Sequence, residues 1–104
     1  MSAVVVFSTF PGPEKAAEVA RALVSEQLAA CVNLVPAVRS IYRWQGELLD
    51  DAETLAIVKT TAERLDALTA RLIALHPYEL PEVIALPVTG GSAPYLAWVA
   101  GEVR

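Results

Sequence analysis

Cysteine, histidine and positive charge are all scarce in this sequence, and each shortage excludes a class of protein. The chain of 104 residues has one cysteine, one histidine and a formal net charge of −4 at pH 7. A single cysteine excludes an intrachain disulfide, so we expect a cytoplasmic protein. Without a basic run, the sequence lacks the electrostatic footprint needed to bind nucleic acid or an anionic membrane surface.

Long apolar runs are missing as well, although apolar residues are abundant. The first such stretch, residues 3–7, is too short to span a membrane and has no charged segment before it, unlike a signal peptide. Yet hydrophobic residues make up 55% of the chain. Because one domain over residues 1–104 has a limited interior, we expect part of this apolar surface to lie in a subunit interface.

The first half of the chain predicts a strand, a helix and a long hairpin. Residues 4–7 are β-branched or aromatic and precede a Pro-Gly-Pro turn, which indicates a buried strand. Proline at the next helical start and a periodic apolar face predict a helix over residues 13–27. Alternating residues then predict strands at 31–44 and 48–59, joined by a turn at Gln45 and Gly46.

Two details of this hairpin can be predicted as well. Pro36 lies inside the first strand and indicates a bulge or an edge position, because proline cannot donate a ladder hydrogen bond. Asp50, Asp51 and Glu53 stand near the start of the returning strand. We interpret these acids as the exposed end of a hairpin that projects beyond its sheet.

The second half predicts helix, strand and helix. Thr60 and Glu63 have the spacing of a capping box, with Thr60 as N-cap. Four leucines follow at helical spacing (Leu65, Leu68, Leu72 and Leu75), and the helix must end at His76 because Pro77 disfavours helical backbone before it. Residues 83–88 predict the last strand. Ser92 is placed to cap a final helix that bears Tyr95, Trp98, Val99 and Val103.

The resulting order is β-α-β-β-α-β with an added C-terminal helix. Two βα crossovers separated by a hairpin are typical of a ferredoxin-like α+β sandwich, with helices on one face of an antiparallel sheet. No nucleophile, base and orienting group stand in a recognisable arrangement, so we do not expect an enzyme.

The segment from His76 to Glu82 concentrates the side chains with the most chemistry. His76 is a candidate metal ligand, which Glu79 and Glu82 could join. Alternatively, His76 bonds the last carbonyl groups of its helix. Cys31 is a second candidate ligand or a reactive thiol, but a small buried apolar side chain is the simpler interpretation.

Aromatic residues and one lysine suggest a binding surface. Tyr42 and Trp44 lie on the hairpin, which has no core of its own, so we predict that they contribute to a subunit interface. Lys59 stands at the end of an apolar strand. It either extends its ammonium group to solvent or lines a cleft that binds an anion.

Five stretches, spread over nearly the whole chain, resemble the CutA family of divalent-cation tolerance proteins. They are Leu28-Ala29-Ala30-Cys31-Val32-Asn33, Ser40-Ile41-Tyr42-Arg43-Trp44-Gln45-Gly46, Val58-Lys59-Thr60-Thr61, His76-Pro77-Tyr78-Glu79-Leu80-Pro81-Glu82 and Tyr95-Leu96-Ala97-Trp98. The resemblance implies a ferredoxin-like subunit of a homotrimer, similar to the PII signalling proteins, whose hairpin pairs with neighbouring subunits. It also implies a part in copper or other divalent-metal homeostasis and ligand sites between subunits.

The resemblance also implies site residues. His76 and Cys31 match positions of the family's His-Pro-Tyr and Ala-Cys-Val motifs and are the candidate metal ligands. Some members have a cysteine where this chain has Ser8 and a histidine where it has Leu75, which leaves this chain with fewer copper ligands. We expect an inter-subunit cleft with these side chains: Tyr42, Trp44, Lys59, Tyr78, Glu79 and Trp98. The alternative is a PII-like signalling or scaffold module that binds a protein partner or an anionic metabolite.

Overall fold

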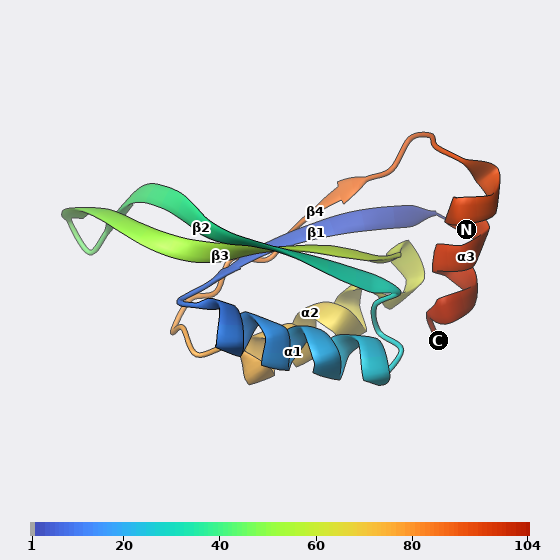
Figure 1. Ribbon diagram of the computed structural model, residues 1–104, viewed down its shortest axis with the longest axis horizontal. Helices are drawn as coiled ribbons and strands as arrows, with labels where there is room; N and C mark the ends of the chain where they lie inside the picture. Colours follow the sequence, from blue (N-terminus) through green and yellow to red (C-terminus); the bar gives the residue numbers. More distant parts are fainter. Residues whose placement is uncertain (1) are drawn as a thin grey trace.

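The computed structural model describes residues 2–104 and has an open antiparallel sheet with two helices on one face (Figure 1). In chain order the elements are β1 (Ala3–Phe10), α1 (Pro13–Ser25), β2 (Cys31–Trp44), β3 (Glu47–Thr61), the 3-10 turn η1 (Ala62–Arg64), α2 (Leu65–Leu75), β4 (Ile84–Pro87) and α3 (Ala93–Glu102). The strand order is β2-β3-β1-β4, and each neighbouring pair is antiparallel. The predicted ferredoxin-like α+β fold is therefore confirmed.

The core lies between the sheet and the helices α1 and α2. Every second residue of β1 is buried, which is the alternation expected of a strand with one covered face. Helix α1 begins at Pro13 as predicted, and its buried residues recur at helical spacing. The main core residues are Val4, Val6, Phe10, Ala16, Val19, Leu23, Val58, Leu68 and Leu72.

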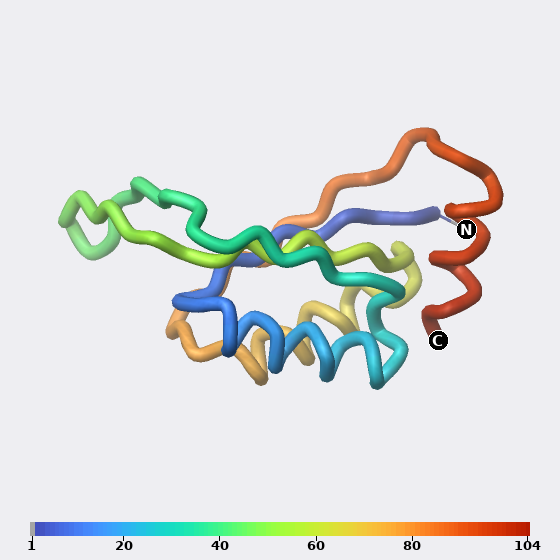
Figure 2. The backbone as a smooth tube through the Cα atoms, viewed as in Figure 1, coloured from blue at the N-terminus to red at the C-terminus, as the bar shows by residue number. Residues whose placement is uncertain are grey.

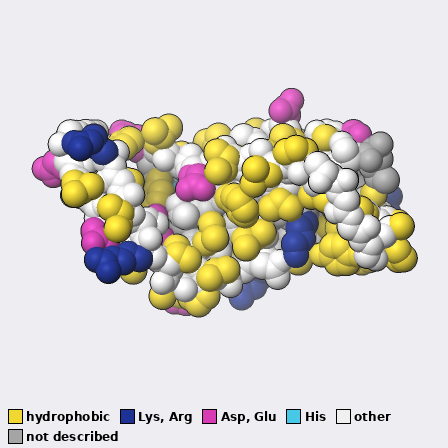
Figure 3. Space-filling view, turned by 90° about the horizontal axis from the view of Figure 1, so that it is seen from above, with side chains coloured by type: hydrophobic (Ala, Val, Ile, Leu, Met, Phe, Trp, Pro, Cys, Tyr) yellow, Lys and Arg dark blue, Asp and Glu magenta, His cyan; other side chains and the backbone are white. Residues whose placement is uncertain are grey.

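The opposite face of the sheet carries no helix, and much of it is apolar. Residues directly opposite one another on antiparallel strands point to the same side, so the strand register identifies this face. Phe7 is paired with both Ile57 and Ile84. We call the following residues the helix-free face: Val5, Phe7, Cys31, Asn33, Val35, Leu55, Ile57, Lys59, Ile84 and Leu86. Figure 3 looks onto this side and shows hydrophobic side chains gathered over its middle.

The hairpin of β2 and β3 extends well beyond the rest of the sheet, which makes the molecule 44 Å long against 25 and 22 Å (Figure 2). The bulge predicted at Pro36 is present, because the register shifts between Val35 and Val38. The predicted turn is present too: Gln45 and Gly46 have φ angles of 50° and 82°, as a two-residue type I′ turn requires.

Two capping predictions are wrong. Thr60 is the second-last residue of β3 rather than an N-cap, and its hydroxyl donates a hydrogen bond to the Leu28 carbonyl at 2.7 Å. The strand continues because this buried bond satisfies the hydroxyl, and no side-chain cap forms at η1 or α2. Ser92 precedes α3 as predicted, but its side chain makes no capping bond, and Val103 lies just beyond that helix.

The end of α2 agrees with the sequence. The helix stops at Leu75, and His76 has extended backbone angles (φ −76°, ψ 139°), as expected before Pro77. Helix α3 lies at the end of the sheet opposite the hairpin (Figure 1). Within residues 2–104, no helix has the length and apolar character to cross a membrane.

Candidate functional site

His76 is buried at the junction between α2 and the end of β1. Its Nε2 lies 2.8 Å from the Thr9 carbonyl oxygen and therefore donates, while its Nδ1 accepts the Tyr78 N–H at 3.1 Å. The ring also stacks on Phe10, with 4.3 Å between centroids. The histidine is thus neutral, and both nitrogens are engaged. Burial lowers the pKa of His76 below 6.5, although the Thr9 carbonyl and the charge of Glu53 act in the opposite direction.

The fixed histidine orients Tyr78, whose hydroxyl donates to Glu53 Oε2 at 2.6 Å. Glu53 is only 8% exposed, so the interpretation of this acid as part of an exposed hairpin end is wrong. Tyr78, in the loop after α2, contacts it there. Burial, followed by the hydrogen bond to Glu53, raises the pKa of Tyr78 well above its usual value.

A second tyrosine–carboxylate pair lies farther out on the hairpin. The Tyr42 hydroxyl donates to Asp51 Oδ2 at 2.6 Å, and this hydrogen bond, with smaller effects of burial and nearby charge, raises the pKa of Tyr42 to about 12. Next to it, Arg39 forms a bidentate pair with Asp50 at 2.9 and 2.7 Å. Asp50 and Asp51 are exposed, as predicted, and their side chains bond across the hairpin to residues of β2.

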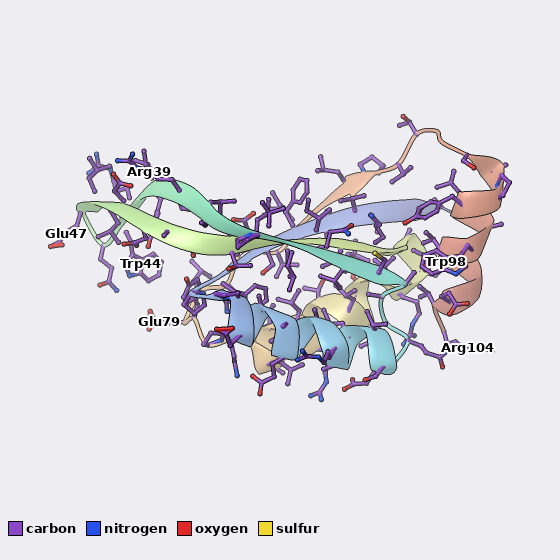
Figure 4. The ribbon with its side chains drawn as sticks, in the orientation of Figure 1. Arg39, Trp44, Glu47, Glu79, Trp98 and Arg104 are labelled. Carbon is purple, nitrogen blue, oxygen red and sulfur yellow. The ribbon has the colours of Figure 1, made fainter. Side chains whose placement is uncertain are left out.

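Tyr42, Tyr78 and Glu53 border a hollow at the base of the hairpin with a volume of about 590 Å³, within the range of small-ligand sites. In Figure 4, Trp44 projects from the hairpin on the side of the loop that carries Glu79. We call this space the hairpin hollow, and its lining residues are Thr9, Ser40, Ile41, Tyr42, Trp44, Glu53, Tyr78, Glu79, Leu80 and Glu82.

Lys59 belongs to a different group, on the helix-free face near α3. Its ammonium nitrogen lies 2.5 Å from Asn33 Oδ1 and 4.0 Å from the Cys31 sulfur, and 5.9 Å from the centre of the Tyr95 ring. We call these four residues the Lys59 cluster. Trp98 lies next to it on α3, with its ring 5.6 Å from that of Tyr95.

The structure therefore divides the residues of the predicted cleft between two regions of the chain. Tyr42, Trp44, Tyr78 and Glu79 meet in the hairpin hollow. Lys59 lies in the other region, and Figure 4 shows Trp98 at the end of the molecule opposite Trp44. A cleft that contains all six residues would need more than one subunit.

The two predicted metal ligands are also apart. Cys31 is paired with Lys59, which in turn is paired with Val5, whereas His76 bonds Thr9, four residues farther along β1. Four strand residues correspond to roughly 13 Å. Within residues 2–104, no group of three or more His, Cys, Asp or Glu side chains is arranged to hold a metal ion. A metal-binding role for either residue stays a prediction.

The simplest interpretation of Cys31, a small buried apolar side chain, is wrong. Cys31 is partly exposed rather than buried, because β2 begins at the rim of the sheet. The register brings it opposite Lys59, a basic neighbour that is 28 positions away in the sequence.

Glu53 and Asn33 were not predicted from the sequence to be site residues. Glu53 has the same alternation as Leu55 and Ile57, which was a signal that it shares their side of β3. Its partner Tyr78 lies 25 positions away, and a contact of that separation has no local pattern.

Together, the antiparallel sheet with two helices on one face, the projecting hairpin and the polar hollow at its base define a ferredoxin-like α+β protein with a candidate ligand site. The family model described as "CutA1 divalent ion tolerance protein" matches residues 4–102. The chain therefore belongs to the CutA1 family.

Individual relatives agree with this assignment. The chain is 53% identical over 95 residues to the divalent-cation tolerance protein CutA of Thermus thermophilus, covering 91% of this chain and 92% of that protein. It is 48% identical to the chloroplastic protein CutA 1 of rice, but it spans only 57% of that protein's length.

Solved structures match the fold closely. A Thermus thermophilus CutA1 structure has a TM-score of 0.95 at 49% identity, covering 98% of this chain and 99% of the other. CutA from Xylella fastidiosa has a TM-score of 0.96 at 42% identity and covers all of both chains.

Proposed function

We propose that this chain forms a homotrimeric, non-enzymatic divalent-cation tolerance protein that binds copper, another divalent ion or a small ligand weakly at clefts between subunits. The observation that carries the proposal is the division of the predicted cleft. Its residues lie in two separate regions of the chain, so a cleft that contains all of them requires neighbouring subunits. Membership of a family described by divalent ion tolerance supports the metal as a ligand.

The helix-free face supports the oligomer. Ile84, Leu86 and Val35 are 54%, 46% and 40% exposed, although they continue the apolar surface that the paired residues Phe7 and Ile57 begin. An apolar sheet face of this kind resembles an obligate interface. Light scattering should give about three times the chain mass of 11.1 kDa. A folded 11-kDa species at micromolar concentration would contradict the proposal.

The state of His76 supports weak rather than tight metal binding. A metal could reach Nδ1 only by displacing the Tyr78 N–H, and Nε2 only by displacing the Thr9 carbonyl. Either exchange costs a buried hydrogen bond, which is worth about 1 kcal/mol. A soft or borderline ion such as copper(II) is the metal for which imidazole competes best.

Calorimetric titration with copper(II) tests this part of the proposal. The wild type should give a saturable isotherm that His76→Ala lacks. Because His76 is buried, His76→Gln is needed beside it, since an amide N–H can still reach the Thr9 carbonyl. Cys31→Ser tests the second candidate ligand. An unchanged isotherm in all three variants would remove both residues from the metal site.

A second candidate function is a PII-like signalling or scaffold module that binds an anionic metabolite or a protein partner. The Lys59 cluster favours it. Among residues 2–104, Lys59 has no carboxylate within ion-pair distance, because the three salt bridges involve Lys15, Arg39 and Arg71. An uncompensated ammonium beside an aromatic ring and an amide can bind an anion.

A thermal-shift screen of nucleotides and organic acids addresses this second function. An anion that binds the Lys59 cluster should raise Tm in the wild type and not in Lys59→Gln. Lys15→Gln is the matched control, because it removes the same charge from an ammonium that is already paired with Glu18. Equal shifts in both variants would exclude the cluster as the site.

The cytoplasm is the compartment we propose for this protein, on the basis of its single cysteine. Relatives differ in this respect, since the rice protein is named chloroplastic and an Archaeoglobus fulgidus structure is titled periplasmic. Fractionation of cells that express the native chain tests the compartment.

A further inference from the structure

The hairpin hollow contains a buried carboxylate without a cationic partner. Glu53 is 8% exposed, and within residues 2–104 its side chain forms no salt bridge. Its one side-chain hydrogen bond in that range comes from the Tyr78 hydroxyl, a neutral donor. Buried charges in proteins are normally paired, because desolvation is costly without a countercharge. The hollow that Glu53 borders is therefore where a cation would offset this cost.

The rest of the lining indicates what kind of cation fits. Three aromatic residues line the hollow, which we call its aromatic walls: Tyr42, Trp44 and Tyr78. Aromatic faces attract cations through the ring quadrupole, and they do so best for large cations that shed water easily. Glu79 and Glu82 lie at the exposed part of the lining and add negative charge.

A bare divalent ion suits this lining less well. Such an ion requires several oxygen, nitrogen or sulfur ligands around it, and residues 2–104 contain no group of three suitable side chains. Glu53 and Asp51 each already accept a tyrosine O–H at 2.6 Å. The volume of about 590 Å³ also far exceeds that of one ion.

We propose that the hairpin hollow binds a small organic cation of the alkylammonium or guanidinium class, with Glu53 as its countercharge and the aromatic walls around its apolar or planar surface. This inference deepens the proposed function and rests on its premise that the protein binds a small ligand. The cation is either a free molecule or a side chain from a second copy of this chain, since both present the same chemistry.

Calorimetry with choline and methylguanidinium tests binding of a free cation, with 3,3-dimethylbutanol as the uncharged counterpart of choline. The wild type should bind the cations and not the alcohol. Glu53→Gln should weaken binding about tenfold or more, because it removes the charge and keeps an acceptor for Tyr78. Trp44→Leu should weaken binding without touching any carboxylate. Glu102→Gln is the control, as it removes one exposed charge on α3.

A side chain from a second copy gives a different result. Free probes then fail to bind the wild type, while Glu53→Gln raises the dissociation constant of the oligomer about tenfold and Glu102→Gln leaves it unchanged. The inference is overturned if no probe binds and Glu53→Gln does not affect assembly. That failure is distinguishable from failure of the proposed function, which the copper titration and the oligomer mass test separately.

Discussion

Two buried hydroxyl groups on the helix-covered side of the sheet differ in whether they have a hydrogen-bond partner, and this difference should affect stability. Thr60 is fully buried and donates to the Leu28 carbonyl at 2.7 Å. Ser8 is also fully buried, but its hydroxyl has no hydrogen-bond partner among the described residues. A buried polar group that lacks a partner costs about 1–3 kcal/mol, whereas a satisfied one contributes modestly to stability.

Removal of the two hydroxyl groups should change the free energy of unfolding in opposite directions. Ser8→Ala should raise the free energy of unfolding by about 1 kcal/mol, because it removes an unsatisfied donor. Thr60→Val should lower it by about the same amount, because the Leu28 carbonyl then loses its donor. Urea unfolding at one fixed protein concentration measures both, since oligomers unfold in a concentration-dependent manner. Destabilisation by Ser8→Ala would show that the hydroxyl is satisfied after all.

The buried histidine should make stability depend on pH. Because burial places the pKa of His76 below its unfolded value of 6.5, the unfolded chain binds a proton more readily than the folded one. The contribution of neutral His76 is therefore complete above pH 6.5 and is lost as the pH falls through the lower folded pKa. As the pH decreases from 6.5 to the folded pKa, the free energy of unfolding of the wild type should decrease relative to that of His76→Gln.

Unfolding curves from pH 8 to pH 5 test this prediction. The quantity to compare is the difference in free energy of unfolding between the wild type and His76→Gln. It should change by about 1.4 kcal/mol for each unit by which the pKa of His76 is shifted. Carboxylates titrate in both proteins and cancel in the difference. A difference that is independent of pH would mean that His76 titrates alike in the folded and unfolded states.

At the scale of elements, the hairpin depends on left-handed backbone at its turn, which Gln45 and Gly46 form, and at its bulge. Gly46 has a φ of 82° at the turn, and Ala37 has a φ of 61° at the bulge. The turn matches the right-handed twist of the two strands, and the bulge bends β2. Both features lie in the hairpin that carries Trp44 and Tyr42 to the hollow.

Gly46→Ala should therefore destabilise the hairpin by about 1–2 kcal/mol, the cost of left-handed backbone for a residue with a Cβ. Space is not the reason, because an added Cβ at Gly46 would meet nothing within 4 Å. Gly101→Ala is the matched control: it also has open space, but it lies in α3 without a positive φ, and alanine should be neutral or stabilising there. Amide exchange across the hairpin distinguishes local fraying from global unfolding.

Local sequence patterns predict the helices, the strands and the hairpin turn of this protein well. Proline at the start of α1, proline after α2, the bulge at Pro36 and the Gln45-Gly46 turn all act through backbone angles within a few residues. The capping box failed because a tertiary bond from Thr60 to Leu28 kept β3 extended. The site was less predictable, since the Tyr78–Glu53 and Lys59–Asn33 contacts join segments 25 and 26 positions apart.

At the scale of the whole molecule, unpaired charges and open apolar surface share one strand. Glu53 lies in the hairpin hollow and Lys59 in the cluster near α3, both on β3, with Leu55 and Ile57 between them on the same alternation. The strand thus carries a negative site, an apolar centre and a positive site along one direction. Several copies that share the apolar centre would bring charged regions of different subunits to their common edges.

Disrupting that apolar centre should separate the subunits while leaving each fold intact. Ile57 lies in the middle of the helix-free face, where it is paired with Phe7 and Asn33, and it is outside the helix-covered core. Ile57→Glu places a charge in the proposed interface, where desolvation opposes burial. We expect the mass to fall to that of one chain, with the circular dichroism of the fold retained.

Ile73 provides the matched control because it is the same residue type and is 48% exposed, but on α2, which covers the other face of the sheet. Ile73→Glu should leave the mass at about three chains, since the proposed interface does not include that helix. If both variants remain trimeric, the helix-free face is not the interface, and the exposed hairpin becomes the next surface to test. If both become monomeric, α2 contributes as well, and the two regions of the divided cleft must meet in another way.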